Sequence, residues 1–365
     1  MVSQLPIWQS NRSANMSSHL PLWLPPLMIF LISLIVALVT APLSIWVGRR
    51  WMLVDHPGGR RIHERMVPRS GGIALFLAFF CGTGAALIFW PPTNPEDMRR
   101  LFAVLTGGGI VFLFGLWDDR RELPAWPQFL AQAAVALVAA AGTVFIERFT
   151  NPLTGQLVII PSLVPHVGWG LVVAITLFWV MGMINTVNWL DGLDGLAAGV
   201  GCIAAVLFAI HSFRLGQAEI ALFPTALAGA CLGFLPFNFH PARVFMGTSG
   251  AMLLGYALAT LSILAPARIA TALLVLGVPI VDVAWIIVQR WRRGVSATQS
   301  GRDHLHHRLL QLGLSQRQIV GLYYVLCMAF GAMALVGPSP RFKLIALGVL
   351  SLGVLSALAW LSRRL

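Results

Sequence analysis

Two short stretches place carboxylates close together in a chain that has few of them. Only 13 of the 365 residues are Asp or Glu, yet Asp118 and Asp119 are adjacent in FGLWDDRREL. Asp191 and Asp194 stand three residues apart in NTVNWLDGLDGLAAGV. Paired carboxylates suit cation binding or proton abstraction. A solvated helix end is the alternative for the first pair, although acids at a helix C-terminus oppose the helix dipole.

The second stretch carries a polar series with a period of three. Its members are Asn185, Asn188, Asp191 and Asp194. Neighbours in such a series share a face of an α-helix, so we expect these side chains to form one wall of a site. Gly192 and Gly195 would let the backbone approach a ligand closely. The alternative is helix termination, with Asp194 capping a helix that begins near Gly195.

A third stretch, SGRDHLHHRLL at 300–310, has three histidines within four residues. This spacing next to arginines fits donors for phosphate oxygens better than a zinc site, which would need a further carboxylate or thiolate ligand. A basic patch for lipid headgroups is the alternative.

Two further stretches are unremarkable alone. LVDHPGGRRIHERMVPRSGGIA (53–74) reads as an irregular basic loop, and FLPFNFHPARVFMGTSGAMLLG (234–255) as a helix–loop–helix. Together, the five stretches supply carboxylates, amides, arginines and histidines. This set of side chains predicts a Mg²⁺-assisted reaction of a phosphorylated substrate at a membrane surface.

The elements that must position these residues are membrane-spanning helices. The chain is 58% hydrophobic with a mean hydropathy of +0.80, and runs of roughly 20 apolar residues recur along it. We expect an all-α polytopic membrane protein with one domain over 1–365, a polar periplasmic leader at 1–20 and its longest cytoplasmic loop at 290–317. The eleven expected spans are 24–46, 71–91, 101–117, 126–146, 168–187, 196–212, 219–237, 249–265, 269–289, 318–337 and 342–362.

The basic residues give the expected orientation. The net charge is +12, and most Lys and Arg fall on loops of one side, so the positive-inside rule favours an outside N-terminus and a cytoplasmic C-terminus. This basicity therefore indicates membrane topology and lipid contact, and we expect no nucleic-acid partner. The five polar stretches then share the cytoplasmic face. A transporter would place acids in the middle of its spans, but only Asp282 is well inside one.

The order VDHPGGRRIHERMVPRSGGIA, GLWDDRREL, NTVNWLDGLDGLAAG, FLPFNFHPARVFMG, RDHLHH resembles the polyprenyl-phosphate N-acetylhexosamine-1-phosphate transferase superfamily, in its GlcNAc-type branch. The resemblance covers nearly the whole chain. It implies transfer of HexNAc-1-phosphate from a UDP-sugar to undecaprenyl phosphate with release of UMP, as the first step of a lipid-linked surface glycan such as the O-antigen. It further implies Mg²⁺, or Mn²⁺ in its place, as cofactor. A homodimer in the bacterial inner membrane, with its active site facing the cytoplasm, is also implied.

The resemblance also implies roles for individual residues. Asp118 would be the base or nucleophile, with Asp119 beside it. The expected metal contacts are Asn188, Asp191 and Thr248. The expected nucleotide contacts are Asp194, Asn185, Asn238, Phe245 and Arg65. The expected pyrophosphate and sugar contacts are Arg302, His304, His306 and His307.

Two positions depart from the family pattern. Thr248 follows FMG where the family has a Mg²⁺-binding Asp, and Trp126 stands where it tends to have a lysine. A threonine hydroxyl can contact Mg²⁺ but brings no negative charge. The alternatives are a rearranged site, a weak enzyme, or an impaired family member that binds its substrates without efficient turnover.

Overall fold

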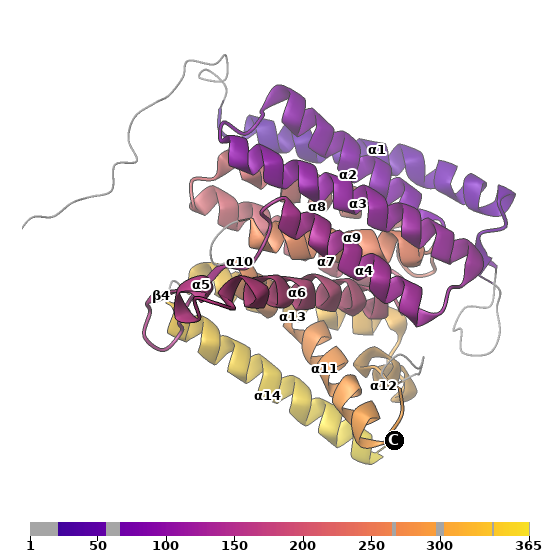
Figure 1. Cartoon of the computed structure of the whole chain (residues 1–365). Coiled ribbons are helices and arrows are strands. Elements are labelled where there is room, and N and C mark those ends of the chain that lie inside the picture. Colours follow the sequence, from indigo (N-terminus) through magenta and orange to yellow (C-terminus); the bar gives the residue numbers. More distant parts are fainter. Residues whose placement is uncertain (1–20, 56–65, 265–267, 297–302, 338, 365) are drawn as a thin grey trace, which may run out of the picture.

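The chain folds as a bundle of α-helices, shown in Figure 1 for a computed structural model. The structure describes residues 21–55, 66–264, 268–296, 303–337 and 339–364. Within these residues, eight helices are long and apolar enough to cross a bilayer, which confirms an all-α polytopic membrane protein. They are α1 (Leu24–Arg50), α2 (Gly71–Phe89), α3 (Pro95–Arg121), α6 (Gly168–Leu190), α7 (Leu196–Arg214), α8 (Ala218–Asn238), α13 (Gln316–Val336) and α14 (Pro340–Arg364).

The remaining expected spans match shorter or broken helices. α4 (Ala125–Ala141) and α9 (Gly247–Ile263) are apolar but have only 17 residues each. The expected continuous span at 269–289 is wrong, because α10 (Arg268–Val275) and α11 (Gly277–Arg292) are bent by 77° between them. Gly277 and Pro279 lie at this break, where both residue types weaken helix continuity.

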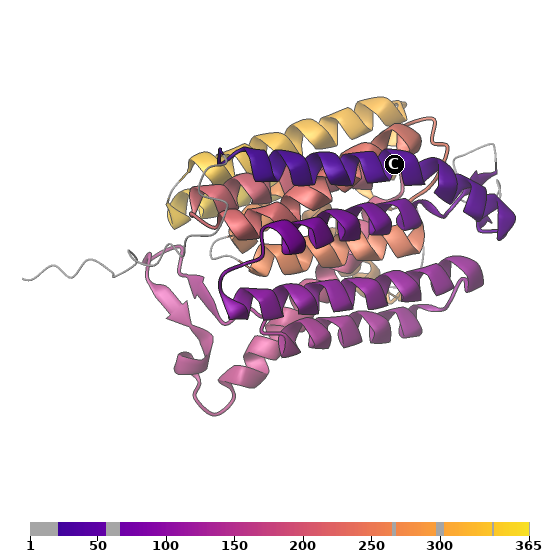
Figure 2. The same cartoon turned by 90° about the horizontal axis from the view of Figure 1, so that it is seen from above.

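Small elements interrupt the all-helical pattern. β1 (Val54–Asp55) pairs antiparallel with β2 (Val67–Pro68), and β3 (Arg148–Thr150) pairs antiparallel with β4 (Leu157–Ile159). Figure 2 shows the second hairpin and the short α5 (Ile160–Leu163) projecting from one end of the bundle. The expected loop at 290–317 contains α12 (Leu305–Gln311). These segments are too short for a hydrophobic period to reveal them in the sequence.

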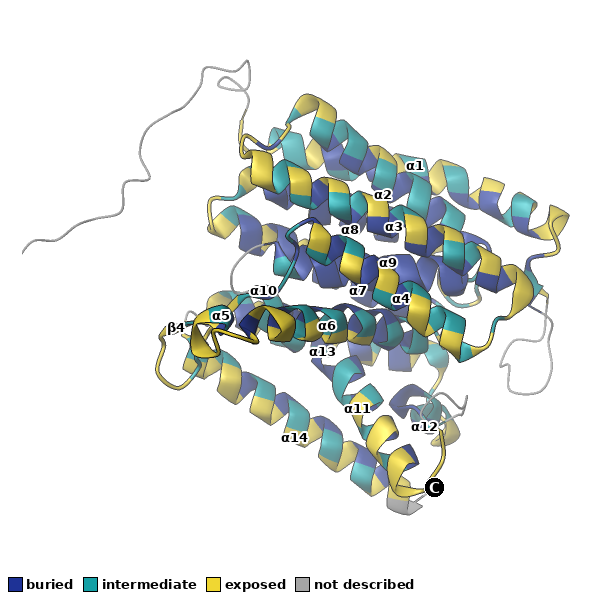
Figure 3. Ribbon diagram, in the orientation of Figure 1, coloured by how far each residue is buried: buried dark blue, intermediate teal, exposed yellow. Residues whose placement is uncertain are grey.

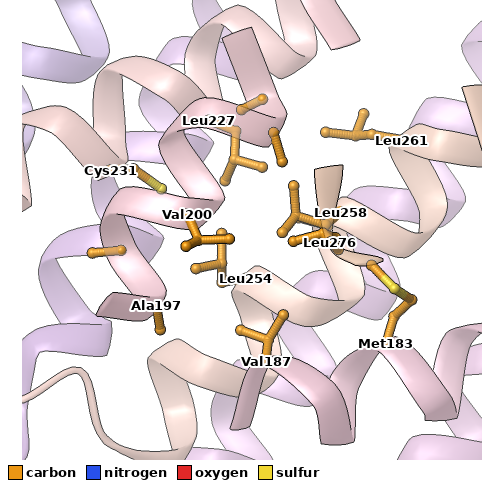
Figure 4. Close-up of a cluster of buried hydrophobic side chains, with 14 of the residues drawn as sticks. Met183, Val187, Ala197, Val200, Leu227, Cys231, Leu254, Leu258, Leu261 and Leu276 are labelled. Atoms are coloured by element: carbon orange, nitrogen blue, oxygen red, sulfur yellow. The ribbon is translucent and has the colours of Figure 1, made fainter. Parts of the chain in front are cut away.

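The core lies around α7, α8 and α9. These helices are mostly buried, whereas α1 and α14 expose one side each, as the colours of Figure 3 show. Figure 4 shows side chains of four elements meeting in the core, among them Val187 of α6, Val200 of α7, Leu227 of α8 and Leu254 of α9. Lipid tails are as apolar as these side chains, so close packing rather than water exclusion stabilises such contacts.

A glycine allows α3 to cross α9 at close range. A Cβ atom added to Gly115 would lie 2.4 Å from Cα of Ser249 and 2.8 Å from its amide nitrogen. Small residues at such crossings let helix backbones approach in membrane proteins. The contact brings the last turn of α3, with its two carboxylates, against the first turn of α9.

Candidate active site

The five polar stretches meet at one end of the bundle, on the right in Figure 1 where α3 and α6 end and α12 lies. Backbone hydrogen bonds join the segment after β2 to the segment before α9. Phe245 N donates to the Pro68 carbonyl at 2.8 Å, and Gly71 N donates to the Phe245 carbonyl at 2.9 Å. The basic loop and the FMG stretch therefore form one wall.

The carboxylate of Asp119 is hydrogen-bonded to the start of α9. Its carboxylate accepts hydrogen bonds from Thr248 N (2.7 Å), Ser249 N (3.0 Å) and Ser249 Oγ (2.7 Å). The first amides of a helix have no partner within the helix, so a carboxylate from another helix satisfies them and complements the helix dipole. Gly247, just before this turn, has a φ of +72°, and a Cβ atom there would lie 2.4 Å from the Arg69 carbonyl oxygen. The chain needs a glycine here to let Arg69 and Asp119 approach α9.

Asp118 is held differently. Its Oδ1 accepts hydrogen bonds from Leu123 N (3.1 Å) and from Gln128 Nε2 (3.0 Å). Among the described residues, Oδ2 has no hydrogen-bond donor. The side chain is buried. Asp118 thus has one fixed oxygen and one oxygen available to a proton, a metal or a substrate.

A cavity of about 190 Å³ adjoins Gln128. Two helices line it with amide side chains: Gln128 and Gln132 from α4, and Asn185 and Asn188 from α6. Asn185 Nδ2 donates to Gln132 Oε1 at 2.6 Å and to the Met181 carbonyl, so this pair fixes α4 against α6. Asn188 has no hydrogen-bond partner in the described part of the chain, which leaves its amide available to a ligand. A larger hollow of about 460 Å³, at Arg50, Trp51, Met52 and Arg120, contains none of the predicted site residues.

The polar series of period three does not lie on one helix. α6 ends at Leu190 and α7 begins at Leu196, so Asp191 and Asp194 lie in the turn between them. Gly195, the N-cap of α7, has a φ of +80°, a conformation that glycine adopts without strain. The predicted shared helix face is therefore wrong for the two aspartates. Capping by Asp194 is also wrong, because α7 has Gly195 at its N-cap and no side-chain cap.

Asp194 joins this turn to the loop after α8. Its Oδ2 lies 2.8 Å from His240 Nδ1 and accepts a hydrogen bond from Ala242 N at 3.1 Å. Asn238 makes a parallel link, since its Oδ1 accepts from Gly195 N and its Nδ2 donates to the Val244 carbonyl. Asn238 is buried, and both its amide oxygen and its amide nitrogen are hydrogen-bonded. These contacts shape the loop that carries Phe245, which is partly exposed.

Asp191 has a different environment from Asp194. Its carboxylate receives no hydrogen bond from the described residues. It is partly exposed at the site, yet the protein packed around it desolvates it and raises its pKa well above the usual value near 3.8. The positive charge of Arg69 opposes this rise, while the negative charges of Asp119 and Asp194 add to it. Asp191 is an acceptor without a partner, surrounded by other acids.

Arg69 is a cationic residue of the site for which the sequence predicted no role. Its Nη1 lies 3.2 Å from Glu122 Oε1 and 3.8 Å from Asp55 Oδ1. Because it also influences Asp119 and Asp191, it offsets part of the negative charge of the site. Its position two residues before Gly71 in PRSGG is the sequence signal that could have identified it.

The histidines lie beside the turn after α6. His304 packs against Trp189 with ring centres 5.6 Å apart and stacks on His306 at 5.4 Å with an interplanar angle of 8°. His306 reaches the turn, because a Cβ atom on Gly192 would lie 2.6 Å from its Nε2. Both ring nitrogens of His306 are buried without a hydrogen-bond partner. His307 packs on His306 at 4.3 Å.

The structure thus brings together all predicted site residues that it describes, and their individual roles stay predictions. Arg65, Arg302 and the leader at 1–20 lie outside the described residues. Gln128, Ser249 and Asp282 were not among the residues predicted for the site. A lone carboxylate inside a span is costly and marks a function, and that signal could have identified Asp282.

The donor set fits Mg²⁺ that arrives with a diphosphate. Mg²⁺ usually keeps several waters and takes one or two carboxylates together with substrate phosphates. No described residue donates to the carboxylate of Asp191 or to Oδ2 of Asp118. Neutral oxygens are offered by Asn188, in the last turn of α6, and by Thr248, whose amide bonds Asp119. Across the described ranges, no three His, Cys, Asp or Glu side chains are grouped closely enough to hold a metal on their own. The residues therefore suit a metal completed by substrate oxygens.

Comparison with known proteins agrees with this geometry. Residues 101–266, which contain Asp118, Asp119, the turn after α6 and the start of α9, match the model of glycosyl transferase family 4. The chain is 31% identical over 313 residues to a probable undecaprenyl-phosphate N-acetylglucosaminyl 1-phosphate transferase of Bacillus subtilis, over 84% of this chain and 83% of that protein. The chain belongs to glycosyl transferase family 4.

Further relatives in the family show the same extent of similarity. A decaprenyl-phosphate N-acetylglucosaminephosphotransferase of Mycolicibacterium smegmatis is 34% identical, over 94% of this chain and 93% of that protein. A phospho-N-acetylmuramoyl-pentapeptide-transferase of Desulforudis audaxviator is 29% identical, over 84% of this chain and 95% of that protein. The resemblance predicted from the five stretches is confirmed.

Proposed function

We propose that this protein transfers N-acetylglucosamine 1-phosphate from a UDP-sugar to a polyprenyl phosphate, at the cytoplasmic face of a bacterial inner membrane. The names of the Bacillus and Mycolicibacterium relatives support the acceptor and the transferred group. The observation that carries the proposal is the different hydrogen bonding of the two carboxylate oxygens of Asp118. Two donors fix one of its oxygens, no described residue donates to the other, and an amide-lined cavity adjoins Gln128, one of the two donors.

The reaction exchanges one phosphorus–oxygen bond for another. A phosphate oxygen of the acceptor attacks the β-phosphorus of the UDP-sugar, and the bond from that phosphorus to the bridging oxygen breaks. UMP leaves with the bridging oxygen, and the product is a lipid pyrophosphoryl sugar. The proton of the acceptor phosphate passes to Oδ2 of Asp118, because a general base must lie within hydrogen-bond reach of the proton that it takes. Such transfers depend mainly on positioning and on charge stabilisation.

The other residues hold the reactants. The amide cavity of Gln128 and Asn188 receives the acceptor phosphate without adding charge next to Asp118. Mg²⁺, held by Asp191 and Asn188 with the hydroxyl of Thr248, would neutralise the diphosphate charge when bound. His306 and His307 lie beside the same turn and provide donors for phosphate oxygens. Phe245 offers an apolar face for the nucleobase.

Thr248 favours a second candidate function. Without a carboxylate at this position, a metal at the site has one negative ligand fewer than the family pattern gives, and Mg²⁺ favours at least one carboxylate. The second candidate is a protein that binds UDP-sugar and lipid phosphate with little turnover. The amide of Thr248 is fixed to Asp119, so an Asp introduced here would sit at the start of α9 beside the other acids.

One assay tests both candidates. Purified protein in detergent is given UDP-GlcNAc, polyprenyl phosphate and Mg²⁺, and released UMP is measured for the wild type and for Thr248→Asp. The proposal expects wild-type release that depends on both the lipid and Mg²⁺, with Thr248→Asp reaching half its maximum at a lower Mg²⁺ concentration. Release by Thr248→Asp alone would establish the second candidate, a wild-type protein that binds its substrates with little turnover. No release from any UDP-HexNAc by either protein would overturn the transferase proposal.

A further inference from the structure

The broken span carries a buried carboxylate that contacts the histidine segment. Asp282 lies on α11, close after the 77° bend, and only 3% of it is exposed. Its Oδ1 accepts a hydrogen bond from Leu305 N at 2.9 Å, and its Oδ2 lies 3.0 Å from Nδ1 of His304. Both carboxylate oxygens are therefore used by two consecutive residues at the start of α12.

This contact determines how the His304 ring is held. A carboxylate is only an acceptor, so Nδ1 of His304 carries the hydrogen in the pair. Nε2, on the other side of the ring, has no hydrogen-bond partner among the described residues. The ring packs between Trp189, in the last turn of α6, and His306. The orientation of His304 is thus set from α11, and its free nitrogen remains for a ligand.

The rest of α12 has further contacts besides those with Asp282. Arg308 donates to the Asp303 carbonyl at 2.8 Å, to Gln289 Oε1 at 3.4 Å, and to Ser362 Oγ of α14. Through these bonds Arg308, four residues after His304 in the chain, attaches the short helix to α11 and α14. A structural anchor for the segment is therefore already present, and the pair with His304 is a separate feature.

We propose that Asp282 is a positioning residue that keeps the proton of His304 on Nδ1 and thereby presents Nε2 as a hydrogen-bond acceptor to a hydroxyl group of the sugar substrate. At metal sites, a carboxylate often fixes the tautomer of a ligating histidine, and loss of that carboxylate commonly lowers metal affinity or activity by about 10–100-fold. We expect an effect of similar size here. The contact with the substrate hydroxyl rests on the proposed transferase function, whereas the proton position can be tested without it.

The first test reads the proton position. Protein labelled with ¹⁵N-histidine is reconstituted in bilayers, and the His304 ring signals are assigned as those lost in His304→Gln. The proposal expects a protonated Nδ1 in the wild type. In Asp282→Asn the amide can donate to Nδ1, so the proton should move to Nε2. Ser362→Ala, which removes a bond of Arg308, should keep the wild-type signals.

The second test reads turnover. If the wild type releases UMP, Asp282→Asn should lower kcat by at least about tenfold with little change in KM for the UDP-sugar, and Ser362→Ala should change neither. An unprotonated Nδ1 in the wild type, or equal effects of Asp282→Asn and Ser362→Ala, would overturn the role of Asp282. Absence of wild-type turnover would overturn the proposed function, and the proton position would still decide the Asp282–His304 pair.

Discussion

Ser249 donates two hydrogen bonds to the carboxylate of Asp119, one from its amide at 3.0 Å and one from its hydroxyl at 2.7 Å. The adjacent Asp118 receives its donors from its own turn and from Gln128 on α4. Two neighbouring carboxylates that look equivalent in the sequence therefore have different surroundings. Asp119 joins α3 to the first turn of α9, and Asp118 keeps one oxygen for chemistry.

The link between α3 and α9 predicts a stability effect. Ser249→Ala removes the hydroxyl bond to a buried carboxylate, and a hydrogen bond to a charged group contributes about 1.5–3 kcal/mol. We expect a clear fall in the midpoint of thermal unfolding in detergent. Ser212→Ala is the matched control, because the Ser212 hydroxyl bonds only the Phe208 carbonyl of its own helix. Equal midpoints for the two variants would show that Asp119 does not depend on Ser249.

The free oxygen of Asp118 predicts a selective loss of turnover. Asp118→Asn should abolish UMP release while UDP-sugar binding stays measurable, because an amide cannot accept the proton. Gln128→Ala should lower kcat by less, since Leu123 N still holds Oδ1. Asp97→Asn, at the other end of α3, changes an acid paired with Arg100 and should leave turnover unchanged. Near-normal turnover of Asp118→Asn would remove the base assignment.

The sequence predicted most of the helices and the residues that gather at the site. Apolar runs of about 20 residues are an unambiguous signal, and polar residues in such a chain stand out because lipid gives them no partners. The order of the five stretches also predicted the family. The same signals placed Asp118, Asp191 and His304 in one site before any contact was known.

The sequence did not predict how the site is held together. Asp119 and Thr248 are far apart in the chain, and a period of three at 185–194 cannot show that α6 ends at Leu190. The bend before α11 depends on packing that a continuous apolar run does not reveal. Partner choice among polar groups is a tertiary property, so Gln128 and Asp282 became visible only with their contacts.

His306 predicts a dependence of stability on pH. Burial, with smaller contributions from His307 and His304, lowers the pKa of His306 well below its usual 6.5. The unfolded chain takes up this proton near that usual pKa while the folded protein does not, so stability is lost as the pH falls below it. The loss is at most about 1.4 kcal/mol per pH unit.

Substitution of His306 measures this effect. In His306→Phe the aromatic ring remains but the group that titrates is absent, so the unfolding midpoint should fall less than in the wild type between about pH 7.5 and 5.5. His166→Phe changes an exposed histidine at the other end of the bundle and should keep the wild-type dependence. The same slope for wild type and His306→Phe would mean that His306 is protonated in the folded protein.

The crossing of α3 and α9 predicts a contrast between two glycines of one helix. Gly115→Ala puts a methyl group 2.4 Å from Cα of Ser249, so the helices must separate and the bonds from α9 to Asp119 must lengthen. Overpacking of this kind costs about 1–3 kcal/mol. Gly109→Ala meets no atom within 4 Å and should keep or slightly raise the unfolding midpoint. Turnover should fall with Gly115→Ala alone, because the start of α9 carries Thr248. Equal midpoints and equal turnover for the two variants would mean that α3 and α9 do not cross at Gly115 as the structure shows.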